Sequence, residues 1–276
     1  MRIAVAGLGI IGVSLARALK ANTEYTVDGW NRTHSVTERA LELNYIDGEV
    51  NEFVSYDVVF VALPPQATID FLKNQKFGED AVVADISGVK QPIEDAVYAE
   101  KRNYRYVGTH PMAGKETNGL ESSSEKLFNG ANIIITKHPR TDEAAIKTIA
   151  NLYAKMGCGR IILCPAAYHD AKIAYTSQLA HIVANAYVKS PSAEGCSGFT
   201  GGSFQDMTRV AGVNEKDWTQ LYFYNRKYVL KELETIVGNL NEYIAALQAE
   251  DKEKMIELLK EGGDIRRSLK CYKDKK

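Results

Sequence analysis

The sequence predicts an α/β domain with a doubly wound, mostly parallel sheet, followed by an all-α domain. Strand-like and helix-like segments alternate from the N-terminus to residue 164, which is the pattern of parallel strands joined by crossover helices. From Pro165 onward no strand-like run reappears, and helical periodicity dominates for about a hundred residues. We therefore expect two domains, residues 1–164 and 165–276.

Composition narrows the classes of protein. A chain of 276 residues with 45% hydrophobic and 25% charged residues is long enough for two cores. Its net charge of −1 argues against nucleic acid as the main partner. Glycines interrupt its apolar N-terminus and no run of eighteen apolar residues occurs, so we expect neither a secretory signal nor a membrane span. The four cysteines form no CxxC pair, so we expect free thiols in a reducing cytoplasm and no metal site.

The first strand and the turn after it resemble a dinucleotide-binding signature. Arg2–Ala6 is a short apolar run, and Val13–Leu19 has helical character. The GxGxxG turn between them suits a pyrophosphate, because its glycines permit a tight turn, close approach of the ligand and close helix packing. The alternative is a plain turn, but a strand before and a helix after the glycines favour the cofactor. The candidate contacts are Gly7, Gly9, Ile10, Ile11 and Gly12.

The end of the second strand predicts the cofactor. An NAD enzyme usually has an acidic residue about 20 positions after the glycines to accept the ribose hydroxyls. Here the strand at residues 25–30 ends at the neutral Asn31, followed by Arg32 and Thr33. Without a carboxylate a 2′-phosphate meets no repulsion, and Arg32 can pair with it. We therefore expect NADP, with NAD as the alternative if Asp28 serves the ribose.

Further strands complete the predicted sheet. The first of them stops at Pro64-Pro65, and we include Leu63 and Pro64 at its end among the candidate cofactor contacts. A helix over residues 142–156 separates the last two strands. The predicted strands cover residues 57–63, 81–85, 104–107, 131–136 and 160–163.

The segment from Gly108 to Glu116 carries the clearest chemical signal. His110 and Glu116 lie six residues apart in a loop punctuated by glycine and proline, directly after the strand at residues 104–107. A titratable imidazole at the end of a strand is where an open α/β sheet places chemistry. The sequence therefore predicts that a redox cofactor and an acid–base group share one crevice.

The helical half offers two further candidate sites. Ser177 and His181 are four residues apart and are expected on the same face of one helix, although a lone helical histidine is more often packed than catalytic. The glycines at 201 and 202 predict a loop that enters a helix and presents Arg209, which suits capture of a carboxylate. The alternative is a helix start with Asp206 favoured by the helix dipole and Arg209 in a local salt bridge.

A long apolar stripe predicts an association surface. Its residues recur at three- and four-residue steps, so they lie on one face of a helix that needs a partner. We expect this face both to pack within the chain and to form a dimer seam. The stripe consists of Val229, Leu233, Ile236, Leu240, Tyr243 and Leu247.

These motifs together resemble the prephenate dehydrogenase family. The resemblance rests on the glycine turn at 7–12, the loop at 85–90, the His-Pro-Met-Ala-Gly run at 110–114 with Glu116, the Ser177–His181 helix and the Asp-Met-Thr-Arg run at 206–209 followed by Trp218. It covers nearly the whole chain. It implies a Rossmann-like domain followed by a helical dimerisation domain, a homodimer, and oxidative decarboxylation of prephenate or arogenate on the way to tyrosine.

The resemblance also assigns roles to individual residues. It implies that His110 is the catalytic histidine and bonds to the ring hydroxyl of the substrate, and that Arg209 binds a substrate carboxylate. His181 would line the substrate pocket. The remaining candidate substrate contacts are Ser87, Glu116, Ser177, Asp206 and Trp218.

The chain departs from the family at two positions. The family commonly has Gly-Ser where this chain has Ser87-Gly88, and it often has a histidine where this chain has Gln178. Two other classes remain open from the sequence: a β-hydroxyacid dehydrogenase, which would use a helical lysine as its acid–base group, and a non-enzymatic NADP-sensing protein, which would not need His110 or Arg209.

Overall fold

A computed structural model describes residues 1–114 and 119–269 of the chain. Glu116 therefore lies outside the described residues. The chain divides into two compact units, Met1–Arg226 and Lys227–Lys276, and we describe each unit by itself.

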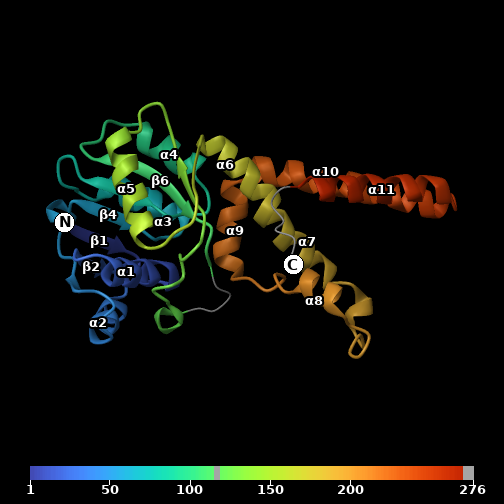
Figure 1. Cartoon of the computed structure of the whole chain (residues 1–276), viewed down its shortest axis with the longest axis horizontal. Helices are drawn as coiled ribbons and strands as arrows, with labels where there is room; N and C mark the ends of the chain where they lie inside the picture. The colour runs from blue at the N-terminus through green and yellow to red at the C-terminus, as the bar shows by residue number, and fades with distance from the viewer. Residues whose placement is uncertain (115–118, 270–276) are drawn as a thin grey trace. The chain divides into compact units, whose positions relative to one another are not determined.

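The first unit contains a mostly parallel sheet, as predicted (Figure 1). Its strands follow the order β3-β2-β1-β4-β5-β6-β7-β8, and only β6 and β7 pair in antiparallel fashion among the neighbours of this sheet. The strands are β1 (Arg2–Ala6), β2 (Thr26–Trp30), β3 (Gly48–Glu49), β4 (Val58–Val61), β5 (Val82–Asp85), β6 (Arg105–Pro111), β7 (Ile133–Thr136) and β8 (Ile161–Cys164).

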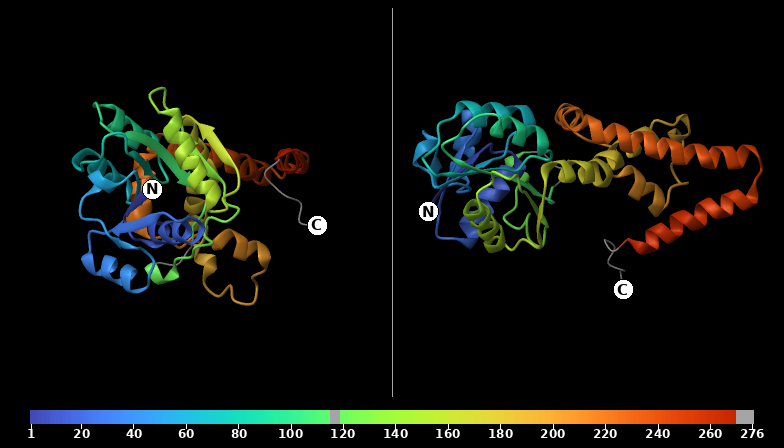
Figure 2. Two further views of the ribbon diagram at one scale, coloured as in Figure 1. Left: turned by 60° about the vertical axis from the view of Figure 1, so that its left-hand side comes forward. Right: turned by 90° about the horizontal axis from the view of Figure 1, so that it is seen from above.

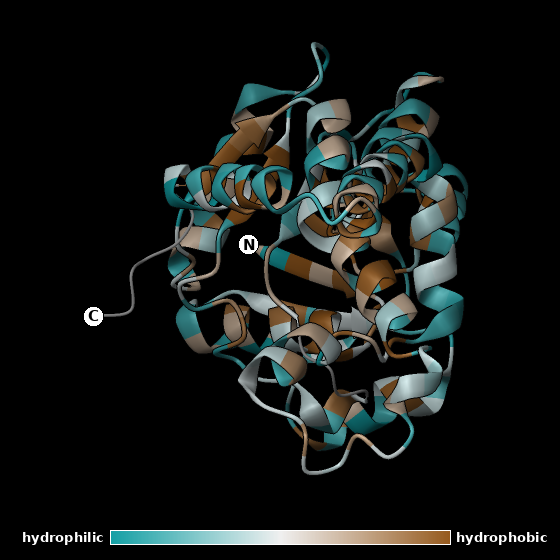
Figure 3. Ribbon diagram, turned by 90° about the vertical axis from the view of Figure 1, so that its right-hand side faces the viewer, coloured by the Kyte–Doolittle hydropathy of each residue, from teal (hydrophilic) through white to brown (hydrophobic). Residues whose placement is uncertain are grey.

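Helices cover both faces of this sheet, because strand side chains alternate in direction. Ile3 and Val5 of β1 belong to a core shared with α1 and α5, whereas Ala4 and Ala6 belong to a core shared with α3 and α4. The strand ribbons are accordingly largely hydrophobic in Figure 3. The flanking helices are α1 (Ile10–Asn22), α2 (His34–Glu42), α3 (Pro65–Asn74), α4 (Gln91–Tyr98) and α5 (Glu143–Lys155).

Two features of the sheet differ from the prediction. The two-residue strand β3 was not expected, because so short a segment has no visible alternation. β6 continues to Pro111, beyond the expected end at Val107, because β7 pairs with it and places Ile134 opposite His110. The prediction that His110 lies in a loop is therefore wrong: it is the penultimate residue of a strand.

A run of helices follows the sheet within the first unit. Residues 166–187 form one continuous helical segment whose middle, Ala174–Gln178, is π-helical. Ser177, expected one regular turn before His181, therefore lies in a wider π-helical turn, a feature frequent at functional sites. The helices are α6 (Ala166–Ile173), α7 (Leu179–Tyr187), α8 (Gly202–Thr208) and α9 (Glu215–Tyr224).

The second unit is a helical hairpin. It contains α10 (Arg226–Gln248), whose first residue still belongs to the first unit, and α11 (Lys252–Ser268). The hydroxyl of Tyr243 donates to the carbonyl of Leu258 at 3.4 Å, and Figure 2 shows α11 folding back after α10 and diverging from it. Among the described residues, no helix is long and apolar enough to cross a membrane.

Candidate active site

The glycine turn after β1 has room for a pyrophosphate. Gly7 has a φ of +98°, and a Cβ on Gly12 would stand 1.9 Å from the Gly7 carbonyl oxygen, so α1 can start this close to β1 only without a side chain there. A Cβ on Gly9 would meet nothing within 4 Å, which leaves open space before α1. The N–H groups of the first helical turn lack intrahelical partners and attract anions. The residues present therefore fit a dinucleotide.

Asn31 is tied to this turn. Its Oδ1 accepts a hydrogen bond from the Leu8 N–H at 3.1 Å, and its Nδ2 donates to the Thr33 carbonyl at 3.2 Å. Arg32 and Thr33 are exposed. Asp28, the alternative ribose acceptor, is buried; its carboxylate accepts from the hydroxyl of Tyr56 at 2.7 Å. These contacts favour Asn31 over Asp28 as the residue nearest the ribose.

A pocket opens beside the glycine turn, at the carboxyl ends of β1, β4 and β5. The strand order reverses between β1 and β4, and this is where open α/β sheets bind ligands. The lining residues come from the start of α1, from the loops after β4 and β5, and from α9. They include Ile11, Leu63, Pro64, Ser87, Gly88 and Leu221.

His110 faces the loop that follows β5. A Cβ on Gly88 would lie 3.8 Å from His110 Nε2, so this nitrogen is turned toward the loop that lines the pocket. Burial lowers the pKa of His110 well below its usual value, and the neighbouring His169 and Lys90 lower it further. The imidazole is therefore neutral near pH 7, as a general base must be.

The order Ser87-Gly88 changes which residue lies next to the imidazole. Gly88 takes that place, and Ser87 is buried with its N–H donating to Asp85 Oδ2 at 2.9 Å. The hydroxyl of Ser87 is buried without a hydrogen-bond partner, although buried hydroxyls nearly always have one. Ser87 therefore offers a hydroxyl at the pocket wall rather than a contact to the histidine.

A buried ion pair fixes the backbone that carries His110. Lys90 Nζ pairs with the Asp85 carboxylate and donates to the Thr109 carbonyl at 2.6 Å. Burial lowers the pKa of Lys90, and Asp85 opposes this shift. Asp85 also accepts from the hydroxyl of Tyr106 at 2.5 Å. Because Thr109 directly precedes His110, this cluster holds the end of β6 in place.

Two residues behind His110 were not predicted as part of the site. His169 Nε2 lies 2.8 Å from His110 Nδ1, and His169 Nδ1 lies 2.7 Å from Asp170 Oδ1. Adjacent histidine and aspartate residues at 169–170 were a visible signal, but only the fold shows that they meet a strand 59 residues earlier. The role of Lys90 could not be recognised from the sequence, because no local pattern indicates that a lysine is fully buried.

The helical half of the first unit forms a second pocket. The rings of His181 and Trp218 are in contact, with centroids 3.9 Å apart and planes tilted by 44°, and both line this pocket with Asn185 and Tyr222. His181 also hydrogen-bonds the Val210 carbonyl at 2.8 Å. The structure therefore brings together the predicted pair His181 and Trp218.

α9 separates this second pocket from the one beside His110. Asp217 and Leu221 line the first pocket, whereas Trp218 and Tyr222 line the second. The sequence predicts one crevice for the cofactor and the acid–base group. The structure has two pockets there, on two faces of α9. His110 itself is not among the residues that line either pocket; it lies behind Gly88, which lines the first.

The other predicted substrate contacts lie nearby. α8 begins after Gly201, as expected, and Arg209 follows its last residue. Arg209 directly precedes Val210, so its backbone lies beside His181. Asp206 is exposed on α8, and Ser177 is half-buried in the π-helical turn.

Gln178 has a structural role. Its Nε2 donates to the Leu221 carbonyl at 3.1 Å, and its Oε1 accepts from Asn225 at 2.6 Å. The side chain is almost fully buried. Its amide joins the π-helical turn to α9, so it does not replace the histidine that the family often has at this position.

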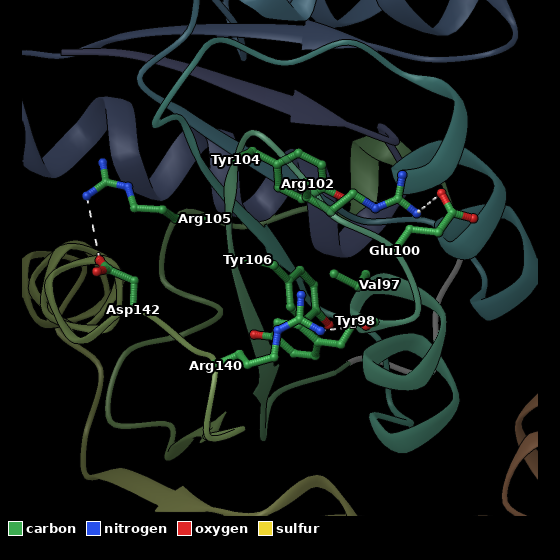
Figure 4. A pocket seen from close by; sticks show the side chains of 9 residues that line it. All are labelled: Val97, Tyr98, Glu100, Arg102, Tyr104, Arg105, Tyr106, Arg140 and Asp142. Carbon is green, nitrogen blue, oxygen red and sulfur yellow. Dashed lines mark hydrogen bonds and ion pairs between the residues drawn. The ribbon is translucent and has the colours of Figure 1, made fainter.

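A further pocket lies at the opposite end of β6 (Figure 4). Arg105, at the start of the strand, is 3.6 Å from the Asp142 carboxylate, and Arg102 is 3.4 Å from that of Glu100. Arg140 donates to the Tyr98 carbonyl at 2.6 Å. These cations are engaged within the protein, so this pocket is not a candidate for the chemistry of His110.

Known proteins match the chain along its whole length. The nucleotide-binding domain of prephenate dehydrogenase matches residues 15–173, and its dimerization domain matches residues 165–261. A cyclohexadienyl dehydrogenase of Zymomonas mobilis is 30% identical over 99% of this chain and 97% of that protein. A prephenate dehydrogenase of Bacillus subtilis is 28% identical over 97% of this chain and 76% of that protein.

A solved structure shows the same arrangement. The prephenate dehydrogenase of A. aeolicus in complex with hydroxyphenyl propionate and NAD+ is 26% identical, with a TM-score of 0.86 over 97% of each chain. Sequence and fold thus agree, and the chain belongs to the prephenate dehydrogenase family.

Proposed function

We propose that this protein oxidatively decarboxylates prephenate to 4-hydroxyphenylpyruvate with hydride transfer to NAD(P), a step of tyrosine biosynthesis in the cytoplasm. The observation that carries this proposal is a neutral histidine whose Nε2 faces the loop at the wall of the glycine-turn pocket. Family membership supports it over a β-hydroxyacid dehydrogenase or a non-enzymatic NADP-sensing protein.

The geometry supports a simple division of labour. His110 Nε2 accepts the proton of the ring hydroxyl, which drives electron density toward the ring carbon. A nicotinamide cofactor held at the glycine turn of residues 7–12 would supply the acceptor for the hydride of this carbon. Loss of carbon dioxide makes the ring aromatic and the reaction effectively irreversible. Arg209 supplies the cation that a doubly charged substrate requires. His181 and Trp218, to which the resemblance also assigns substrate contacts, line the pocket on the other face of α9.

Arogenate is the alternative substrate. It carries an amine where prephenate carries a keto group. The chain is also similar to the structure of an arogenate dehydrogenase from Synechocystis, with 25% identity and a TM-score of 0.80; the match covers 98% of this chain and 100% of that one. We favour prephenate because both matching domain families, and the relatives from Bacillus subtilis and A. aeolicus, carry that name.

One assay panel tests the proposed function. The purified protein is mixed with NADP or NAD and with prephenate, arogenate or a 3-hydroxy acid, and reduced cofactor is followed by absorbance. We expect turnover with prephenate. Turnover only with arogenate would change the substrate, turnover only with the hydroxy acid would change the enzyme class, and none with any of them would leave a binding protein.

We further propose NADP as the preferred cofactor. Asn31 Oδ1 already accepts the Leu8 N–H, and an aspartate there can keep this bond while its second oxygen accepts from the ribose and repels a 2′-phosphate. Asn31→Asp should therefore shift the ratio of kcat/KM values toward NAD by roughly 10- to 100-fold, which corresponds to about 1.5–3 kcal/mol.

The measurement compares kcat/KM for both cofactors in the parent, in Asn31→Asp and in Arg32→Ala. The arginine variant is the control, because it should lose NADP preference without gaining affinity for NAD. A parent that prefers NAD would mean that Arg32 points away from the ribose.

We propose that the chain forms a two-fold homodimer through its helical part, residues 165–276, with residues 1–164 binding the cofactor. The match to a dimerization domain supports this. Within the second unit, Leu240 and Leu247 are 53% and 68% exposed, and Ile256 and Leu259 are 64% and 61% exposed. Apolar surface gathered on one small hairpin is typical of an association site.

Light scattering at micromolar concentration should give the mass of a dimer. Leu240→Asp should weaken the dimer, because it places a charge on the apolar stripe, whereas Asn241→Asp, which adds the same charge next to the stripe, should not. A fully active parent monomer would rule out this interface.

A further inference from the structure

Two side chains form a chain of hydrogen bonds behind His110. His110 Nδ1 and His169 Nε2 are 2.8 Å apart, and their rings meet edge to face with centroids 5.0 Å apart. His169 Nδ1 is 2.7 Å from Asp170 Oδ1. His169 and Asp170 are each about 1% exposed, so water does not compete for these bonds.

The carboxylate of Asp170 is held as an acceptor. Its Oδ1 accepts from the Lys90 N–H at 2.8 Å and its Oδ2 accepts from the Gln91 N–H at 2.9 Å. These groups begin α4, and a helix N-terminus favours the ionised carboxylate. The position of the residue is also fixed, because Asn225 donates to its backbone carbonyl at 2.9 Å.

This arrangement determines where the protons lie. An ionised carboxylate can only accept, so His169 must donate from Nδ1. Burial lowers the pKa of His169 as well as that of His110, so each neutral ring carries one proton. His169 Nε2 is then an acceptor, His110 must donate from Nδ1, and His110 Nε2 keeps its lone pair.

We propose that Asp170 and His169 are positioning residues that hold the proton of His110 on Nδ1 and leave Nε2 as the base. The proposal deepens the proposed function, on which it rests for the identity of the reaction. In solution a histidine is free to carry its proton on either nitrogen, and with the proton on Nε2 His110 would donate to the substrate hydroxyl instead of accepting from it.

The same pair stabilises His110 after it takes the substrate proton. His110 then carries a positive charge, and its Nδ1–H remains bonded to His169, whose own Nδ1–H points to the negative Asp170. The other charged groups in this cluster, Lys90 and Asp85, neutralise each other as an ion pair. The arrangement parallels the way a buried aspartate orients a catalytic histidine in hydrolases, with one imidazole inserted between them.

Two variants separate hydrogen bonding from packing. In His169→Gln the side-chain oxygen reaches the position of His169 Nε2 and can accept from His110, whereas His169→Met has a similar length and no comparable acceptor. We expect His169→Met to lower kcat about 100-fold and to change KM little. This loss is at the lower end of the rate enhancement that a general base usually provides. We expect His169→Gln to recover kcat to within about tenfold of the parent. Equal losses in both variants would overturn the proposal and leave a packing role.

A spectroscopic readout needs no turnover. The nitrogen chemical shifts of ¹⁵N-histidine-labelled protein distinguish the two tautomers, and loss of the His110 signals in His110→Asn assigns them. We expect the parent to protonate Nδ1 of His110 and His169→Met to lose this preference. A parent protonated on Nε2 would overturn the proposal even if neither His169 variant folds. A parent with the expected tautomer but no dehydrogenase activity would contradict only the proposed function.

Discussion

His110→Asn should bind the cofactor as the parent does and lose turnover by roughly two to four orders of magnitude, the usual contribution of a general base. The amide cannot take the hydroxyl proton, but it fits the space of the imidazole beside Gly88. Cofactor titration and steady-state kinetics measure the two effects separately. His138→Asn is a matched control, because His138 stacks on Tyr98, which lines the pocket at the opposite end of β6. Near-normal turnover of His110→Asn would make His110 structural.

The pH dependence of the parent provides a second check on this base. Burial lowers the pKa of His110 below 6.5, so the imidazole remains unprotonated as the pH falls through that value. The parent's kcat/KM, which reports the free enzyme, should stay level through pH 6.5. It should decline only at lower pH, where His110 takes up a proton and ceases to be a base. A decline centred above pH 6.5 would contradict this environment.

Arg209→Ala should raise the KM for the substrate by roughly 10- to 100-fold, because a charge-assisted bond to a carboxylate contributes about 1.5–3 kcal/mol. The cofactor KM should not change. Arg209→Lys should give an intermediate KM, since it restores the charge without the planar, bidentate geometry of guanidinium.

Lys216→Ala is the matched control for this charge. Lys216 is exposed in the first turn of α9 and is not among the residues lining either pocket that α9 borders. Its removal should leave substrate kinetics as in the parent. If Arg209→Ala also kept parent kinetics, Arg209 would have a structural role, the alternative that its sequence context leaves open.

The sequence predicts the sheet well because its signals are local. The apolar runs of the strands and the glycines at 7, 9 and 12 follow from the geometry of each segment, and they place the glycine turn at the carboxyl end of β1. The extent of β6 could not be predicted, because Thr109, His110 and Pro111 become strand only through pairing with β7. Pairing between distant segments has no local pattern.

For the same reason, only part of the candidate site could be predicted from the sequence. His110 was recognisable from its own surroundings, and His181 and Trp218 from a resemblance, and the structure places the last two in contact. Lys90 has no distinctive local pattern, and the adjacent His169 and Asp170, although visible in the sequence, do not reveal which strand they meet. Their importance comes from contacts 80 residues apart in the chain, where the Lys90 N–H meets the Asp170 carboxylate.

The π-helical turn at Ala174–Gln178 makes the helical segment at residues 166–187 intolerant of length changes. His169 is anchored to the sheet through His110, and His181 is anchored to the Val210 carbonyl. Each residue of a helix turns its successor by about 100°, so deleting one residue between these anchors would rotate one histidine away from its partner. Relatives with a histidine at both positions are therefore expected to conserve the number of residues between them more strictly than the identity of those residues.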